Sequence, residues 1–424
     1  MIYKSREEKI IGAAWRALGA PKLPPGPYGA DTEASVRRAL LDGNFDARSV
    51  FGGPALFALQ EAAKVPLGDD CAVWNTGKFS LLSTTDMLVE GTHFILPEKR
   101  TIPRPTRPEY ADPRDRLGSL FNLGWKSLAV NVSDIAACGG LPVGYLVSLG
   151  IPPETKDAEI SAFTKGVAKA SRAFRVRVFG GDLVSSQCWI VSVTVLGIAE
   201  NGLAVGRAGA APGDHILVTG DIGLARTGME VLYPALSGLP RHIVPDISGF
   251  PESVKTFTRP VAQIKTGRIL AARGLATAML DTSDSIAKSV RLLCEAGGTG
   301  CVLELGEFRA HPEVERYTGM LEKSPELREG GRDIGYESTY LERFILDSAE
   351  DYQLLFTVPP DALDRAGFFA KAAPSQNYII ELYRKGGKAM RIGEMTRGKK
   401  LVVNRHGKLY PLMESGFEHF GKTG

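Results

Sequence analysis

The segment GDDCAVW (68–74), followed by STTDMLVEGTHF (83–94) and LGWKSLAVNVSDIAACGGLP (123–142), decides how this chain folds and where its chemistry lies. It contains three short acidic motifs, GDD (68–70), STTD (83–86) and NVSD (131–134), each beside an apolar run, and we interpret them as acidic loops. Hard cations such as magnesium take oxygen ligands and share one or two carboxylates with substrate phosphates. The segment therefore predicts a site for a metal-bound nucleotide.

Three further aspartates stand in similar settings, Asp182 in FGGD (179–182) and Asp281 and Asp284 in DTSD (281–284). Each motif alone has a structural alternative: GDD is typical of a tight turn, FGGD of a hairpin, and DTSD of a helix cap. Asp70, Asp86 and Asp134 complete a set of six such aspartates, which chance does not explain. The two glycines of FGGD would also let the backbone approach a phosphate. Together the motifs indicate phosphoryl transfer.

Composition limits the classes of protein to which the chain can belong. Its 424 residues are 44% hydrophobic, which predicts a globular protein of two or three domains. Lys and Arg exceed Asp and Glu by only +3, so charge gives no reason to expect a nucleic-acid or membrane partner. Five cysteines without a CxxC pair indicate neither a disulfide framework nor a zinc site, and they fit a reducing cytoplasm. We see no targeting or transmembrane segment.

Apolar periodicity predicts a mixed α/β chain without repeats. We expect an N-terminal helical extension (1–55), an α/β domain that binds ATP and magnesium (56–205), a basic Pro-rich insertion within it (97–116), and a C-terminal α/β domain (206–424). Strands are expected from residue 81 and at 145–150, 176–179, 189–198, 212–220, 301–305 and 354–358; helices are expected at 123–138, 157–174, 224–232, 264–273 and 283–296.

His93 follows the strand that contains STTD, and the basic insertion begins four residues later. A lone histidine after a strand is more often structural, but the nearness of Asp86 makes His93 a candidate contact for an anionic substrate. The insertion is either a solvated excursion or a flap that grips phosphate. A chance match to the P-loop spacing at 416–423 is rejected, because only Gly424 follows it in the sequence and leaves no helix for the loop to open.

Taken in order, these motifs together with GRAGAAPGDHILVTG (206–220), DTSDSI (281–286), AEDYQLLFTV (349–358) and RIGEM (391–395) resemble the thiamine-monophosphate kinase family. That family lies within the superfamily of aminoimidazole ribonucleotide synthetase and selenophosphate synthetase. The resemblance implies a two-domain fold, in which an N-terminal sheet domain dimerises and is followed by a C-terminal α/β sandwich domain. It also implies a homodimer that uses ATP and Mg²⁺ to phosphorylate a small phosphorylated substrate.

The resemblance assigns roles residue by residue. Metal ligands would be Asp70, Thr85, Asp86, Asp134, Asp182, Asp281 and Asp284. ATP would contact Gly181, Asp182, Arg207 and Ser283, and the substrate would contact His93, Glu350 and Phe417. Catalysis would depend on Asp70, Asp86, Asp182 and Arg207 through in-line transfer of the ATP γ-phosphoryl group to the phosphate of thiamine monophosphate, giving thiamine diphosphate.

The chain departs from the family pattern where the acceptor would bind. Ser285 stands where the family has the glycine of its Asp-Leu-Ser-Asp-Gly motif, and Ser348 and Ala349 replace a Gly-Gly pair. Lost glycines remove backbone freedom and reshape a pocket. Two alternatives therefore remain open: an ATP-dependent superfamily member that acts on another phosphorylated or amide metabolite, and a nucleotide-binding regulatory protein without turnover.

Overall fold

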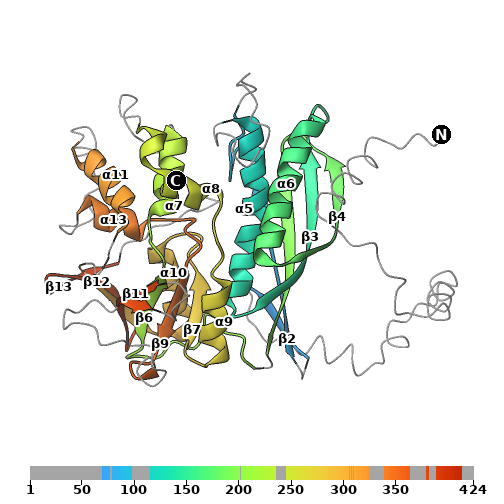
Figure 1. Ribbon diagram of the computed structural model, residues 1–424. Coiled ribbons are helices and arrows are strands. Elements are labelled where there is room, and N and C mark those ends of the chain that lie inside the picture. The colour runs from blue at the N-terminus through green and yellow to red at the C-terminus, as the bar shows by residue number, and fades with distance from the viewer. Residues whose placement is uncertain are drawn as a thin grey trace, which may run out of the picture.

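The computed structural model describes residues 69–76, 79–97, 115–200, 202–234, 245–304, 306, 308, 310–323, 339–362, 379–381 and 388–412. Within these ranges the chain forms two packed units, each built on its own sheet (Figure 1). The predicted N-terminal extension and nearly all of the predicted insertion at 97–116 lie outside the described residues. None of the described helices is both long enough and apolar enough to cross a bilayer.

The first sheet has the strand order β1-β2-β5-β3-β4. Its strands are β1 (Ala72–Asn75), β2 (Phe79–Val89), β3 (Leu141–Ile151), β4 (Arg177–Ser185) and β5 (Ile190–Glu200). All neighbours are antiparallel except β3 and β4, which are parallel and joined through helix α6 (Asp157–Phe174). Alternation along β5 is regular: Val191, Val193 and Val195 are buried, while the residues between them are only half-buried. One face of this sheet therefore forms a core and the other does not.

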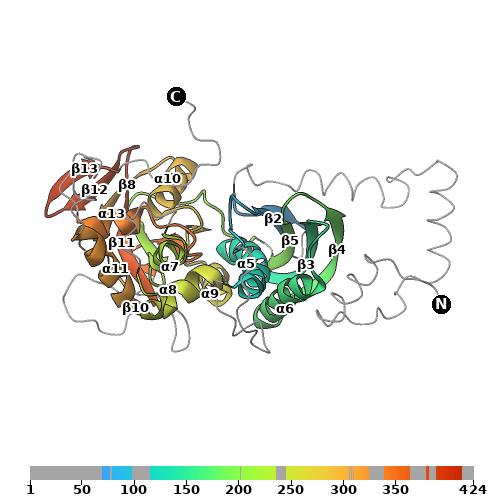
Figure 2. The same cartoon turned by 90° about the horizontal axis from the view of Figure 1, so that it is seen from above.

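Helices α5 (Arg116–Ala137) and α6 cover the buried face of the first sheet, as the view from above shows (Figure 2). Their apolar side chains form one core with the valines of β5 and with Trp189 and Tyr145. The opposite face of the sheet leaves large apolar side chains exposed; they include Phe79, Met87, Leu141, Val143, Leu146, Phe179, Val184 and Ile198.

The second sheet has the order β13-β12-β8-β11-β6-β9-β7, with β10 paired to β11. Its strands are β6 (His215–Thr219), β7 (Ala278–Asp281), β8 (Gly300–Glu304), β9 (Leu354–Val358), β10 (Ile379–Glu381), β11 (Lys388–Thr396), β12 (Leu401–Arg405) and β13 (Lys408–Pro411). Both faces are covered: Ile216 and Val218 of β6 belong to one core and Leu217 to another. Successive residues of a strand point to opposite faces, so β6 contributes to both cores.

Helices surround the second sheet. They are α7 (Leu224–Leu232), α8 (Pro251–Thr258), α9 (Ile264–Ala272), α10 (Ile286–Gly297), α11 (Pro312–Glu322) and α13 (Tyr340–Leu346), with a 3-10 turn η3 (Ile247–Gly249). Helix α10 packs on one face of the sheet and α9 on the other. Helices α7, α8, α11 and α13 form a separate apolar cluster around Tyr317.

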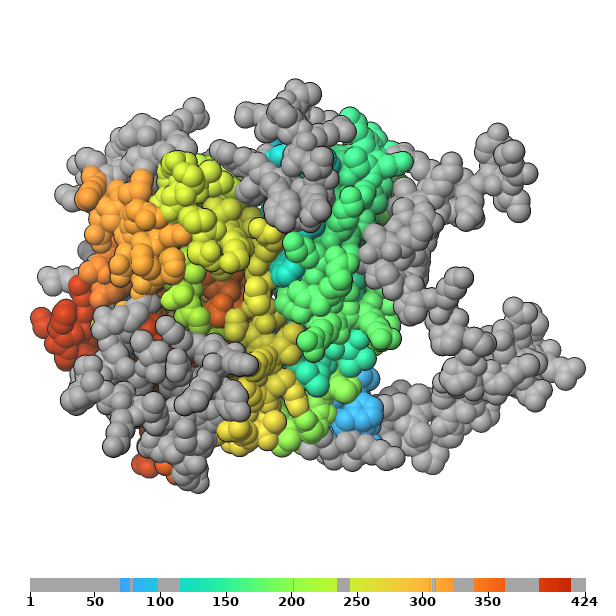
Figure 3. All heavy atoms as spheres, viewed as in Figure 1, coloured from blue at the N-terminus to red at the C-terminus, as the bar shows by residue number. Residues whose placement is uncertain are grey.

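Helix α5 lies at the junction of the two units and contacts β2, β3 and β5 on one side and α8, α9 and β7 on the other (Figure 2). Nearly all of its residues are buried, as expected of a helix enclosed on every side. A side chain at Gly267 of α9 would lie 2.0 Å from the carbonyl oxygen of Ala136, so only glycine permits this approach. The units consequently abut, as the contact between yellow atoms of the second unit and green atoms of the first shows (Figure 3).

The predicted mixed α/β class is confirmed, and several predicted elements agree with the structure within two residues at each end, including α6, α7 and β9. Two of the three predicted acidic loops are wrong as loops: residues 83–86 lie inside β2, and residues 131–134 lie inside α5. The hairpin alternative for FGGD is also wrong, because residues 179–182 lie inside β4. The predicted domain boundary at 205/206 falls between β5 and β6 and stays a prediction.

Candidate active site

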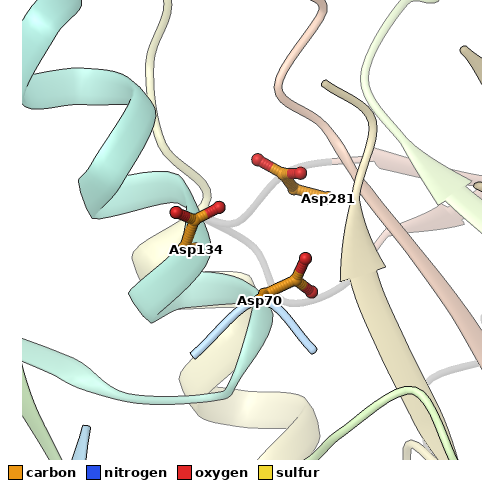
Figure 4. A group of neighbouring side chains, drawn as sticks. All are labelled: Asp70, Asp134 and Asp281. Carbon is orange, nitrogen blue, oxygen red and sulfur yellow. The ribbon is translucent and has the colours of Figure 1, made fainter. Parts of the chain in front are cut away.

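Three carboxyl groups converge at the junction of the two units (Figure 4). Asp70 comes from the bend before β1, Asp134 from α5, and Asp281 from the end of β7. One oxygen atom from each carboxyl group lies within 4.8 Å of the other two. Segments distant in the sequence thus bring three of the predicted aspartates together, two from the first unit and one from the second.

Asp70 is held by Arg207, whose guanidinium Nη2 donates to Asp70 Oδ1 over 2.5 Å. The neighbouring Asp69 accepts the backbone N–H of Arg207 on Oδ2 over 3.1 Å. A side chain at Gly206 would lie 2.6 Å from the same Oδ2 atom, so a larger residue here would displace the Asp69 carboxylate. The segment that joins the two units is therefore fixed against the acidic bend.

Asp134 and Asp86 face each other across α5 and β2. Thr84 donates its hydroxyl to Asp134 Oδ2 over 2.6 Å, and Asn131 accepts the backbone N–H of Asp86 on its amide oxygen over 2.9 Å. Asn131 and Asp134 are three residues apart and share a face of the helix. These two hydrogen bonds hold β2 against α5 at Thr84 and at the backbone of Asp86.

Asp281 is tied back to the first unit by Ser133, which donates its hydroxyl to Asp281 Oδ2 over 2.6 Å. The side chain of Asp281 is 3% exposed, and that of Asp70 is 4% exposed. Burial raises the pKa of Asp281 to about 6 and, together with the charge of Asp281, the pKa of Asp70 to about 8. Burial and three neighbouring carboxylates raise the pKa of Asp134 well above its usual range.

The carboxylate oxygens of Asp70, Asp134 and Asp281 are suitable ligands for a hard divalent cation. Carboxylate oxygens are the ligands that Mg²⁺ prefers, and a buried carboxylate needs a compensating partner. Among the described residues none donates a hydrogen bond to Asp70 Oδ2, although that atom is buried. A cation between Asp70, Asp134 and Asp281 would satisfy this oxygen and offset the burial and the neighbouring carboxylate charges that raise the three pKa values.

Three further predicted residues, Asp86, Ser283 and Asp284, interact with this cluster directly or through one another. Asp86 is close enough for its charge to raise the pKa of Asp281, and burial followed by the charge of Asp284 raises the pKa of Asp86. Asp284 itself pairs with Lys288 over 2.7 Å at the start of α10. Ser283 lies within hydrogen-bond reach of Asp281. The cluster thus continues through Asp86 toward Asp284.

Thr85, Gly181 and Asp182 are not brought to the cluster. The Thr85 side chain is exposed on the outer face of β2, opposite the face of Thr84, where its hydroxyl contacts Thr194 and the carbonyl of Val193. Asp182 lies on the edge strand β4 and is exposed. Gly181 packs its backbone against β3, where a side chain would lie 1.9 Å from the carbonyl oxygen of Val147.

The predicted substrate contacts differ in their surroundings. His93 accepts the backbone N–H of Val89 on Nδ1 over 3.0 Å, which fixes the imidazole at the end of β2. Glu350 forms an ion pair of 2.9 Å with Lys126, a residue of α5 that sequence reasoning did not select. Phe417 lies outside the described residues. The role of each as a substrate contact stays a prediction.

Sequence reasoning also missed Asp69, Thr84, Asn131 and Ser133 as supports of the cluster. All four lie inside the motifs GDD, STTD and NVSD, so the sequence contained a signal for them. The strand expected from residue 81 and the helix expected at 123–138 include these motifs, but the interpretation as loops did not use the strand alternation and helical spacing that decide which side chains point to the cluster.

Comparisons with known proteins agree on one family. The family model "AIR synthase related protein, N-terminal domain" matches residues 68–199. The chain is 33% identical over 235 residues to a thiamine-monophosphate kinase from Bacillus subtilis, an alignment that covers 55% of this chain and 64% of that protein, slightly under two thirds. It is 30% identical over 303 residues to one from Aquifex aeolicus, which covers 70% of this chain and 81% of that protein.

A solved structure described as AaThiL complexed with AMPPCP and TMP superimposes with a TM-score of 0.62 at 26% identity. The superposition covers 87% of this chain and 96% of that one. Both units of the present chain are therefore contained in the shared fold.

Proposed function

Because this chain belongs to the thiamine-monophosphate kinase family, we propose that it transfers the γ-phosphoryl group of ATP to the phosphate of thiamine monophosphate, giving thiamine diphosphate and ADP. The observation that carries this proposal is the convergence of Asp70, Asp134 and Asp281, with a buried oxygen of Asp70 left for a ligand. Phosphoryl transfer between two phosphates needs positioning and charge neutralisation more than covalent chemistry.

We propose Mg²⁺ as the cation, held by Asp70, Asp134 and Asp281, with Asp86 and Asp284 available for further ions. Bound Mg²⁺ would supply positive charge that offsets the repulsion between the donor and acceptor phosphates. The protein's own part is to hold these carboxylates rigidly, through the Thr84, Ser133 and Arg207 contacts described above. Rigid donors need little rearrangement during the reaction.

Arg207 is the group best placed to bind a phosphate directly. Its guanidinium reaches Asp70, and guanidinium groups bind both phosphate and carboxylate oxygens. The acceptor oxygen belongs to a phosphate that is already largely ionised near neutral pH, so the reaction needs no general base. Asp86 would therefore act through the metal and not as a proton acceptor.

We also propose that the protein is a homodimer that packs through the outer face of the first sheet. Support comes from the exposed apolar side chains of that face, among them Met87 at 55% and Val184 at 53% exposure. Large exposed apolar side chains gathered on one face often mark an interface. Asp182 and Thr85 lie on the same face, and the register through β3 and β5 aligns Asp182 with Met87, two residues along β2 from Thr85. In a dimer they could face the partner's site, which would reconcile their predicted role with their distance from the cluster.

We further propose that the chain divides into two domains at 205/206 and that the protein is located in the cytoplasm. The described cysteines are all free, which fits a reducing compartment. His93, Glu350 and Phe417 are proposed as acceptor contacts, and Gly181 and Ser283 as ATP contacts.

The test is to incubate the purified protein with Mg²⁺, ATP and thiamine monophosphate and to follow thiamine diphosphate and ADP by chromatography. Equal amounts of both products are expected, and Asp70→Asn should abolish them. ADP without the diphosphate would move the assignment to another acceptor. Magnesium-independent ATP binding without any turnover, unchanged in Asp70→Asn, would favour a regulatory protein.

A further inference from the structure

A buried lysine of the first unit forms an ion pair with a carboxylate of the second, beside the acidic cluster. Lys126 is 7% exposed, and its ammonium lies 2.9 Å from Glu350 Oε2 and 3.9 Å from the centre of the Phe257 ring. Burying an ammonium is costly unless it is paired, so this position has a specific requirement for positive charge. An apolar residue would fill the same space on α5 without that cost.

Glu350 is held in an uncommon backbone conformation. Its φ angle is +63°, in the left-handed region that non-glycine residues rarely adopt. Its backbone N–H donates to the carbonyl oxygen of Ser283 over 2.7 Å, which ties it to the loop between Asp281 and Asp284. The backbone is thus fixed to the metal-binding loop, and the side chain is fixed to α5 by Lys126. Such strain, held by its surroundings, is common at ligand sites.

The Lys126–Glu350 ion pair lies near the acidic cluster but does not belong to it. Lys126 precedes Ser133 and Asp134 by seven and eight residues on the same helix, which corresponds to about 10–12 Å along its axis. Tyr352, whose φ is also positive, lies where the charges of Glu350 and of the cluster both reach its hydroxyl. Glu350 therefore lies near the cluster, but far enough away to contact a part of the acceptor other than its phosphate.

The acceptor proposed above carries a phosphate and, a few bonds away, a cationic thiazolium ring. Glu350 has a second carboxylate oxygen, Oε1, which receives no hydrogen bond from the described residues, and its side chain is 26% exposed. One oxygen is thus occupied by Lys126 and the other is accessible. A carboxylate oriented in this way can meet a cationic ring without first losing rotational freedom.

We propose that Lys126 is a positioning residue for the acceptor: it fixes the Glu350 carboxylate so that its accessible oxygen meets the cationic ring. This inference depends on the proposed function. Lys126 touches neither ATP nor the phosphates in this arrangement and acts only through Glu350. Its removal should therefore weaken acceptor binding and leave nucleotide binding unchanged.

The experiment measures KM for thiamine monophosphate and for ATP, and ATP affinity by calorimetry, in Lys126→Met, Glu350→Gln and the double variant. Lys126→Met should raise KM for the acceptor about tenfold and change KM and affinity for ATP less than about twofold. In the Glu350→Gln background the same substitution should have no further effect on acceptor KM, because the two residues act as a unit.

Lys169→Met is the matched control, since Lys169 also lies over an aromatic ring, Phe121, at 5.9 Å but contacts no acceptor residue. It should leave both KM values unchanged.

Equal changes for ATP and acceptor, a lower acceptor KM in Lys126→Met, or additive effects in the double variant would each overturn the inference. If Lys126→Met does not fold, the double variant, which removes both charges, carries the test through its comparison with Glu350→Gln. A wild-type protein without diphosphate product would refute the proposed function itself, whereas an active wild type with an unaffected Lys126→Met variant refutes only this inference.

Discussion

Replacing Asp281 by asparagine should stabilise the metal-free protein while removing its response to Mg²⁺. The carboxyl group is 3% exposed, and burial raises its pKa from 3.8 to about 6. A shift of about two units corresponds to about 3 kcal/mol by which the folded state disfavours the ionised form. Asparagine carries no charge, and its amide oxygen can still accept the hydrogen bond from Ser133.

The sign of the effect depends on pH. The folded-state pKa lies above the unfolded-state value, so the cost is absent below about pH 4, grows between pH 4 and 6, and is complete above pH 6. In EDTA at pH 8 we expect Asp281→Asn to raise the free energy of unfolding by about 1–3 kcal/mol, the lower figure allowing for a weakened hydrogen bond. At pH 4 the two proteins should be nearly equal.

The assay is urea unfolding followed by circular dichroism, in EDTA and in millimolar Mg²⁺, at pH 4 and pH 8. Wild-type protein should gain about 2.7 kcal/mol at a Mg²⁺ concentration one hundred times Kd, and Asp281→Asn should gain little. Glu295→Gln, which removes an exposed charge near the end of α10, is the control and should behave as wild type. A less stable Asp281→Asn variant in EDTA at pH 8 that keeps the full Mg²⁺ response would refute the reasoning.

Three further predictions follow from individual contacts. Thr84→Val, which loses the hydrogen bond to a cluster carboxylate, should weaken Mg²⁺ activation about threefold to tenfold; magnesium titration of the activity against the wild type measures this, and an unchanged titration would contradict it. Asp351→Ala should lower the free energy of unfolding by about 2 kcal/mol, because Asp351 accepts two backbone N–H groups at the start of α7; an unchanged urea midpoint would contradict this. Met87→Glu should convert the proposed dimer to a monomer in light scattering, and a dimer that persists would place the interface elsewhere.

The sequence predicted the chemistry of the site better than its geometry. Asp70, Asp134 and Asp281 were selected because carboxylates beside hydroxyl and amide groups suit a magnesium nucleotide, and the structure brings them together. The interpretation of STTD and NVSD as loops was wrong, whereas the strand expected from residue 81 and the helix expected at 123–138 contain these motifs in the structure as well. In a strand Thr84 and Thr85 must point to opposite faces, and only Thr84 reaches the cluster.

Contacts that cross between the units could not be found from local patterns. Lys126 and Glu350 are 224 residues apart, and neither stands out by composition. A buried lysine on an apolar helix is a local conflict that the sequence does show, since Lys126 interrupts the run from Leu123 to Val130. Its resolution depends on which element packs there, and that is fixed by tertiary structure. Asp182 presents a similar limit, because in the proposed dimer its predicted role would depend on a second copy of the chain.

The ion pair between Arg207 and Asp70 has a consequence for how the ligands of the proposed reaction bind. Both groups are largely buried, and in the absence of a cation each is the other's main compensating charge. If Asp70 coordinates a cation, the attraction of its carboxylate for the guanidinium weakens, and Arg207 becomes available to a phosphate. If Arg207 binds a phosphate first, Asp70 loses its partner and attracts a cation more strongly. Each ligand therefore increases the affinity for the other, and by linkage the two enhancements must be equal. The site should accordingly bind metal and nucleotide together much more tightly than either alone, and the residue that enforces this coupling is the arginine that enters the cluster from the segment joining the two units.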